Sequence, residues 1–114
     1  MAERTIQVVY SRPFPGRDDE YNEWYDQRHL PDVLSIPGVL SAQRYDLRLT
    51  ARDQGQEPEY RYLTIYEIEG DPDEVMARFG AGVASGEMVL SPAFDVAGTK
   101  ISFWSPHGDK GVSG

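Results

Sequence analysis

The chain has 114 residues, with 11 lysines and arginines against 19 aspartates and glutamates for a net charge of −8, and this length predicts one domain with one core. Hydrophobic residues make up 39%, too many for a disordered chain, and the absence of cysteine excludes disulfides, thiolate nucleophiles and cysteine-type zinc sites. The acidic balance argues against nucleic acid, and we find neither an apolar run of the roughly 20 residues that a membrane span needs nor a secretory signal. We therefore expect a soluble, cytoplasmic protein without a membrane partner.

The first elements are a strand and a helix. Residues 5–11 alternate apolar and polar side chains, as a half-buried strand does, and the Pro-Phe-Pro-Gly run at 13–16 ends it. Acidic residues at 18–20 favour a helix N-terminus. This helix is expected to continue to about residue 29 or 30, where Pro31 breaks or bends it, because proline lacks a backbone donor and clashes with the preceding turn.

Two strands follow. Alternation over residues 39–50 predicts a long strand, which starts after the Ile-Pro-Gly stop at 36–38. The polar stretch 51–59 is typical of a loop. Residues 60–69 are rich in tyrosine, isoleucine and threonine, which favours a further strand.

The last elements are a second helix and a last strand. Asp71 can cap that helix, Pro72 suits its first position, and the Glu74 side chain can return to the cap backbone. The last strand is expected over 96–104, and residues 106–114 form a polar tail.

The order β-α-β-β-α-β predicts an α+β fold of the ferredoxin-like type, in which both helices cover one face of a four-stranded antiparallel sheet. We expect one domain over residues 1–105, followed by the tail.

The predicted sheet is apolar on both faces. Tyr60, Tyr62 and Tyr66 share one face of the third strand, while Leu63 and Ile65 occupy the other. A sheet of this kind needs a second cover, and the chain has no spare element to supply it. We therefore predict a homodimer packed through its sheet faces. The tyrosine face is interpreted as the dimer core, with lining of a pocket as the alternative.

One segment carries candidate chemistry. Tyr25 and His29 lie one helical turn apart, and Asn22, Asp26 and His29 follow at spacings of four and three residues, so a helix would place these four side chains on one face. A carboxylate beside an imidazole fixes its tautomer and raises its pKa, which suits general acid–base catalysis near neutral pH. We predict His29 as the acid or base, Asp26 as its orienting group, and Tyr25 or Asn22 as the donor to a substrate oxygen.

Each of these roles has a structural alternative. His29 could be a structural histidine near a helix C-terminus, where the helix dipole favours a positive charge. Asp26 is equally suited to a surface ion pair with Arg28 or Arg44. Trp24 is interpreted either as packing or as a stacking wall. The residues predicted to bind a flat substrate are Asn22, Trp24, Tyr21 and Tyr66.

The stretch Asn22-x-Trp24-Tyr25-Asp26-x-x-His29-Leu30-Pro31, with Ile36-Pro37-Gly38-Val39 opening a strand, resembles the dimeric α/β-barrel superfamily, and within it the EthD-like small bacterial proteins. The sharp part of the resemblance is confined to about residues 21–39. It implies a ferredoxin-like protomer, a homodimer with a barrel between the sheets, and a pocket between helices and sheet. The superfamily includes cofactor-free monooxygenases, polyketide cyclases, isomerases and haem-degrading enzymes, so the fold does not fix the reaction.

We therefore predict a cofactor-independent enzyme that uses general acid–base catalysis on a small aromatic or polyketide-like molecule, by cyclisation, isomerisation or oxygenation. No metal is expected, because the two histidines are far apart and form no metal-binding motif. One alternative is a non-enzymatic dimeric ligand-binding or stress-associated module. The other is a haem-binding or haem-degrading protein with His29 as the iron ligand.

Overall fold

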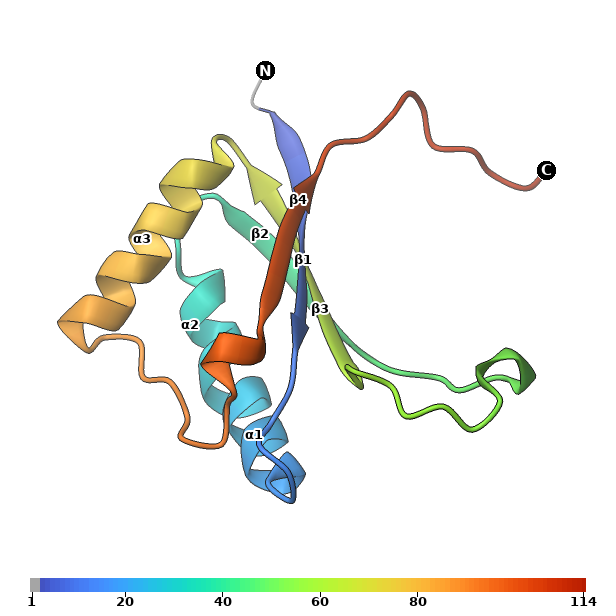
Figure 1. Cartoon of the computed structure of the whole chain (residues 1–114). Coiled ribbons are helices and arrows are strands. Elements are labelled where there is room, and N and C mark those ends of the chain that lie inside the picture. The colour runs from blue at the N-terminus through green and yellow to red at the C-terminus, as the bar shows by residue number, and fades with distance from the viewer. Residues whose placement is uncertain (1–2) are drawn as a thin grey trace.

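The computed structural model describes residues 3–114, which form one antiparallel sheet with helices packed on one of its faces (Figure 1). The strands are β1 (Arg4–Ser11), β2 (Val39–Asp46), β3 (Tyr62–Glu69) and β4 (Lys100–Trp104). The helical elements are α1 (Asp18–Trp24), η1 (Tyr25–His29), α2 (Leu30–Leu34), η2 (Ala51–Asp53), α3 (Pro72–Ser85) and η3 (Val96–Gly98).

The strand order is β2-β3-β1-β4, and every neighbouring pair is antiparallel. This is the ferredoxin-like α+β fold, so the predicted fold class is confirmed. In the described residues no helix is both long enough and apolar enough to cross a membrane.

The first helical run is longer than expected, because α1, η1 and α2 follow one another without a break from Asp18 to Leu34. The run passes Pro31 through a π-turn, in which the Leu30 N–H donates to the Tyr25 carbonyl five residues earlier. A proline inside an α-helix clashes with the carbonyl four residues before it. The wider π-turn relieves this clash, so Pro31 changes the path of the helix without ending it.

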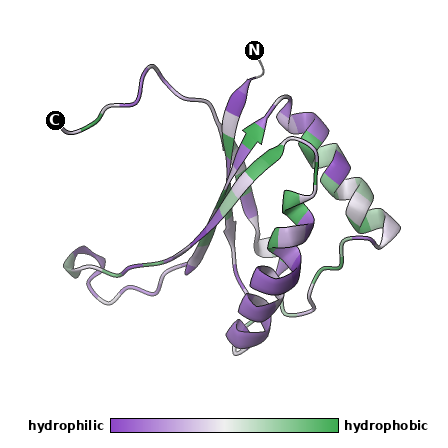
Figure 2. Cartoon of the chain, turned by 180° about the vertical axis from the view of Figure 1, so that it is seen from behind, coloured by the Kyte–Doolittle hydropathy of each residue, from purple (hydrophilic) through white to green (hydrophobic). Residues whose placement is uncertain are grey.

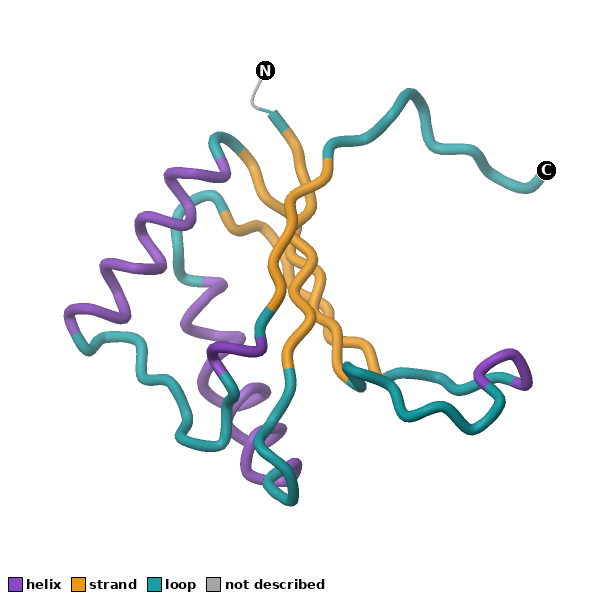
Figure 3. Tube along the Cα trace, in the orientation of Figure 1, coloured by secondary structure: helices purple, strands orange, loops and turns teal. Residues whose placement is uncertain are grey.

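Three strand ends differ from the predicted ones. β2 ends at Asp46, β3 begins at Tyr62, and β4 begins at Lys100. The connection between β2 and β3 therefore spans residues 47–61 and extends away from the sheet (Figure 3). Before β4 the chain makes the 3₁₀ turn η3, because the Asp95 carboxylate accepts the Gly98 N–H at 3.1 Å and pulls the backbone out of the extended form.

The start of α3 agrees with its predicted capping in part. Asp71 Oδ1 accepts the Asp73 N–H at 2.9 Å, and Pro72 occupies the first helical position. Glu74 does not return to the cap. Its carboxylate lies 3.4 Å from Arg78 Nη2, one turn along the helix.

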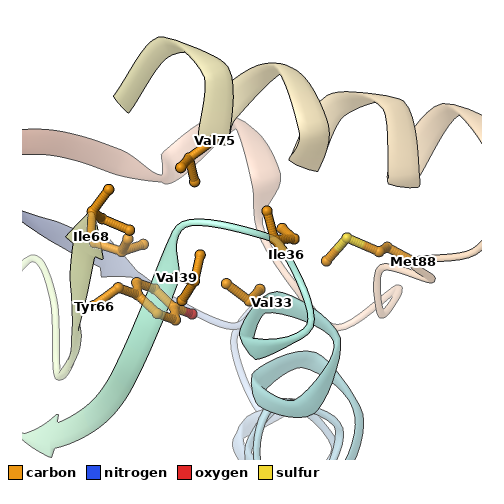
Figure 4. Packing of buried hydrophobic residues seen from close by; sticks show 8 residues of the cluster. Val33, Ile36, Val39, Tyr66, Ile68, Val75 and Met88 are labelled. Atoms are coloured by element: carbon orange, nitrogen blue, oxygen red, sulfur yellow. The ribbon is translucent and has the colours of Figure 1, made fainter. Parts of the chain in front are cut away.

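Two of the three residues of the predicted tyrosine face, Tyr62 and Tyr66, lie on the helix-facing side of the sheet and not in a dimer core, whereas Tyr60 precedes β3 and packs on Tyr10 of the opposite face. Thr64, Tyr66 and Ile68 are buried on the helix-facing side at 2%, 2% and 0% exposure. In Figure 4 the Tyr66 ring extends from β3 toward the helical layer, with its hydroxyl oxygen at the far end. The first helical run and α3 supply the cover that we had assigned to a second molecule. Tyr66 packs in the core cluster of Val9, Val33, Ile36, Val39, Tyr66, Ile68, Val75 and Met88.

The opposite face of the sheet carries exposed apolar side chains. Ile6, Tyr10, Tyr45 and Trp104 are 37%, 43%, 48% and 59% exposed, and the register places Val8 opposite Ile65 at the centre of this face. The 47–61 connection and the C-terminal segment both extend on this side, away from the helices (Figure 1). Hydropathy differs sharply between elements, since α1 is mainly hydrophilic while hydrophobic segments lie along the sheet (Figure 2).

Candidate functional site

A cavity of about 220 Å³ lies between the helices and the sheet. Its walls come from η1 and α2, from α3, from β1, β3 and β4, and from the segment between α3 and β4. The walls are mainly apolar. The polar residues among them are Gln7, Tyr25, His29, Tyr66 and Thr99. A cavity of this size suits a molecule of two or three fused rings, since a cavity of about 150 Å³ already holds benzene.

His29 forms part of the cavity wall at the end of the π-turn. Its ring is 6% exposed and stacks on Trp24, with centroids 4.5 Å apart and planes 26° apart. Tyr25 meets the same ring edge to face at 4.9 Å. Within residues 3–114 the buried Nδ1 atom of His29 has no hydrogen-bond partner. The imidazole is thus held by aromatic packing, with one polar atom unsatisfied.

The electrostatic surroundings of His29 keep it neutral. Burial lowers its pKa from 6.5 to about 4, Asp32 acts weakly in the opposite direction, and the positive charge of Arg44 lowers the pKa further. The expected rise in pKa from a neighbouring carboxylate is therefore wrong in sign. The cause is the loss of water around the ring, which outweighs the nearby charges.

Asp26 does not orient His29. Its Oδ1 atom accepts from Arg44 Nη1 at 2.8 Å, which is the surface ion pair weighed as the alternative. The π-turn explains the difference. Its hydrogen bond spans five residues rather than four, so positions 26 and 29 no longer share a face as they would in an α-helix.

Arg44 is the residue whose importance the sequence did not reveal. Its side chain is only 15% exposed, and its guanidinium carbon lies 4.4 Å from the centre of the Tyr25 ring. Arg44 Nη2 also donates to Asn22 Oδ1 at 2.7 Å. The guanidinium therefore packs over the face of the Tyr25 ring in a cation–π contact. The sequence offered Arg44 as one of two ion-pair partners for Asp26, but it gave no indication of the contact with the Tyr25 ring.

A chain of hydroxyl groups borders the cavity. Thr64 Oγ1 donates to the Tyr25 hydroxyl at 2.9 Å, and the hydroxyls of Tyr25 and Tyr66 are 3.3 Å apart. Burial raises the pKa of Tyr66 far above its ordinary value, so the phenol keeps its proton at neutral pH. This arrangement offers donors to an oxygen in the cavity. Thr64 was not among the predicted residues.

The structure brings three of the predicted site residues to the cavity, namely Tyr25, His29 and Tyr66. The other predicted residues lie outside the lining. Tyr21 is fully buried and its hydroxyl bonds to Ser11, while burial raises its pKa to about 12. Asn22 bridges Arg44 and the Tyr62 hydroxyl. Trp24 stands behind the imidazole and donates from Nε1 to the Val89 carbonyl at 2.9 Å.

Other wall residues were missed because they come from distant parts of the sequence. Met76 and Phe79 reach the cavity from α3, and Leu90 and Phe94 reach it from the irregular segment that follows. The apolar stripe of the predicted second helix contains Met76 and Phe79, but such a stripe indicates a buried face and not a cavity. In the part of the chain that the structure describes, no group of three or more His, Asp or Glu residues is placed to hold a metal ion.

Neither a protein-family model nor a curated protein matches this chain. Solved structures do. An EthD family protein from Bacillus halodurans C-125 matches with TM-score 0.62 and 14% identity, over 90% of this chain and 99% of that one. A Streptomyces coelicolor monooxygenase from the gene ActVA-Orf6, in complex with nanaomycin D, matches with TM-score 0.52 and 16% identity, over 98% and 94%. The haem degrader MhuD from Mycobacterium tuberculosis, with two haems bound, matches with TM-score 0.57 and 16% identity, over 94% and 99%.

At these identities the likeness shows the fold. The chain has the ferredoxin-like fold of the EthD family proteins, and the predicted resemblance to the dimeric α/β-barrel superfamily is confirmed at that level.

Proposed function

We propose that this protein is an enzyme that binds a small, flat, largely apolar molecule in the cavity and transfers a proton through His29. The observation that carries this proposal is the buried, neutral imidazole of His29, which forms part of the cavity wall, while its covered Nδ1 atom has no hydrogen-bond partner in residues 3–114. An unsatisfied buried polar atom costs about 1–3 kcal/mol. The fold keeps the imidazole beside the cavity in spite of this cost, and a bound molecule would meet the ring atoms that line the cavity.

The site is suited to removing a proton from carbon or oxygen. A neutral imidazole accepts the proton, and the negative charge then develops on the substrate inside an apolar cavity. The Tyr66 hydroxyl, supported by Tyr25 and Thr64, is placed to donate to the oxygen that carries this charge. The imidazolium gains from the new anion beside it, which compensates for the low pKa that burial imposes on the empty site.

The resulting carbanion or enolate has several possible fates: ring closure, isomerisation, or attack on dioxygen. The likeness to a monooxygenase crystallised with nanaomycin D favours oxygenation among these. All of the proposed proton-transfer steps use residues of this chain, so the reaction needs no bound cofactor.

The same proposal includes a homodimer formed through the open sheet face. Exposed Ile6, Tyr10 and Trp104 make this face unusually apolar for a protein surface. The 47–61 connection and the C-terminal segment extend on this side of the sheet, where they would contact a second copy (Figure 1).

Haem is the second candidate ligand. A neutral imidazole is the form that binds iron, and the low pKa of His29 supplies it at pH 7. His29 would hold the iron, and the fold is shared with a haem degrader, but the cavity of about 220 Å³ is smaller than a porphyrin and would have to widen to admit it. A Soret band that appears on haem titration, and is lost in His29→Ala, would favour this candidate.

The test of the main proposal is the rate of oxygen uptake with anthrone as substrate. His29→Asn should lower the turnover about 10²–10⁴-fold, because it removes the proton acceptor, and should leave the melting temperature nearly unchanged. His107→Asn is the matched control, since His107 is exposed in the C-terminal segment. Equal turnover in wild type and His29→Asn would remove His29 from the mechanism. Binding of anthrone without any turnover would instead favour a ligand-binding module.

A further inference from the structure

Gln7 is a buried amide at a position where the fold would accept an apolar residue. It lies on the helix-facing side of β1, between the buried Thr5 and Val9, and is 7% exposed. In the described chain its side chain makes one hydrogen bond, in which Nε2 donates to the sulfur of Met76 at 3.7 Å. A thioether is a weak acceptor, and an amide offers two donors and an accepting carbonyl. Most of the hydrogen-bonding capacity of Gln7 is therefore unused.

Gln7 is one of the residues that line the cavity, so a molecule bound there would meet its side chain. The sheet register places it directly opposite Tyr66 on β3 and Phe103 on β4. Directly opposed residues in an antiparallel pair have Cβ atoms about 4.5–5.5 Å apart. Gln7 and Tyr66 thus form a polar pair on the cavity floor, while His29 belongs to the helical wall.

We propose that Gln7 is a specificity-determining residue, and that it selects flat aromatic molecules that carry a hydroxyl or carbonyl oxygen directed toward the sheet. The amide can donate to a carbonyl, and it can both donate to and accept from a hydroxyl. The inference rests on the proposed function for the identity of the cavity as the substrate site. It adds that the substrate carries an oxygen on the side of the ring that faces Gln7 and Tyr66.

The experiment compares 1-naphthol with naphthalene, two probes of the same shape that differ by one hydroxyl, by isothermal titration calorimetry. The wild type should bind 1-naphthol at least about fivefold more tightly, because naphthalene leaves the amide unsatisfied. In Gln7→Leu this ratio should fall toward one, with only the Tyr66 hydroxyl left to bond the naphthol oxygen, while naphthalene binds as tightly as before or more so. Gln7→Met, which matches the length of the side chain, is the second variant if the branched leucine does not fit.

Thr5→Val is the matched control. Thr5 has a buried hydroxyl without a partner in residues 3–114, two positions from Gln7, but it does not line the cavity. Its replacement should leave the ratio unchanged. The melting temperature gives a second readout, since removing an unsatisfied amide should raise it in Gln7→Leu.

Three results would overturn the inference: an undiminished preference for 1-naphthol in both Gln7 variants, a marked fall in their melting temperature, or no binding of either probe by the wild type. The outcome for His29 is separate. An unchanged turnover in His29→Asn would refute the proposed chemistry, whereas the ratio of the two probe affinities depends on Gln7.

Discussion

The properties of His29 follow from its neighbours more than from its own chemistry. Trp24 covers one face of the ring and Tyr25 its edge, so water is removed without a charged partner taking its place. A histidine in this situation is a neutral group with a free nitrogen. This is why the residue suits proton transfer in an apolar cavity, and also why it should make folding sensitive to pH.

Stability should fall as the pH decreases from 6.5 to about 4. The pKa of His29 is about 4 in the folded protein and about 6.5 when unfolded, so the unfolded chain binds a proton that the folded one excludes in this window. The free energy of unfolding is at its full value above pH 6.5, and the titration of His29 should lower it by about 3 kcal/mol by about pH 4. Urea unfolding at pH 7.0, 6.0 and 5.0 measures it.

His29→Gln should flatten this dependence, whereas His107→Gln, which alters the exposed second histidine, should keep it. If the free energy of unfolding of the wild type were constant between pH 7 and 5, the buried, neutral state of His29 would be refuted.

At this scale the sequence identified the right segment and offered the observed Asp26–Arg44 pair only as an alternative to the Asp26–His29 contact. The spacing of Asp26 and His29 predicted a contact that an α-helix would form, and the π-turn removed it. The Asp26 carboxylate instead accepts a hydrogen bond from Arg44, which also donates to Asn22 and packs over the face of the Tyr25 ring. A partner 18 residues away on a strand leaves no trace in local spacing, so the sequence could not choose between Arg28 and Arg44, and the contacts of Arg44 with Asn22 and Tyr25 required the structure.

Elements were easier to predict than their ends. The alternating patterns located all of the strands of the sheet, because one buried face imposes a period of two. Their ends depended on competing local bonds. The Asp95 carboxylate accepts a hydrogen bond from the Gly98 N–H, so β4 begins later than predicted. Thr50 caps the short turn η2, which lies outside the sheet. Pro31 was expected to break or bend the helix, and the π-turn lets the helix continue past it with a changed path.

Packing between elements makes Gly38 indispensable. Its φ of +101° is one that side chains rarely adopt, and a Cβ atom there would lie 2.9 Å from Val75 Cγ2 of α3 and 3.1 Å from the Glu69 carbonyl. Gly38→Ala should therefore lower the free energy of unfolding by about 2 kcal/mol or more, because α3 would have to move away from the sheet. Chemical denaturation measures this change.

Gly80→Ala is the control within the same layer. A Cβ atom at this exposed position of α3 meets nothing within 4 Å, so alanine should raise the stability by about 0.5–1 kcal/mol through helix propensity. Equal effects of the two substitutions would mean that α3 does not pack on the 36–38 turn as the structure has it.

For the whole molecule, the sequence established that both faces of the sheet are apolar but assigned one of them wrongly. Tyr66 was interpreted as dimer core, and it lies under the helices at 2% exposure. Alternation shows which residues share a face, but it does not show which face the helices cover. The assignment needs the connections, and the open face proves to be that of Val8 and Ile65.

The dimer should therefore be disrupted from Ile65 rather than from Tyr66. An aspartate at the centre of the open face would bury an unpaired charge against the second copy. We expect Ile65→Asp to weaken dimerisation at least about a hundredfold, equivalent to about 3 kcal/mol, so that light scattering detects a monomer at micromolar concentration.

Ala77→Asp introduces the same charge on the exposed side of α3 and should leave the dimer intact. Because Ile65 is only partly buried in the single chain, the circular dichroism spectrum of the monomeric variant should remain that of a folded protein. A wild-type protein that scatters as a monomer at micromolar concentration would contradict the dimer outright, and the open face would then require another partner. Retention of the dimer in Ile65→Asp would place the contact on a different surface.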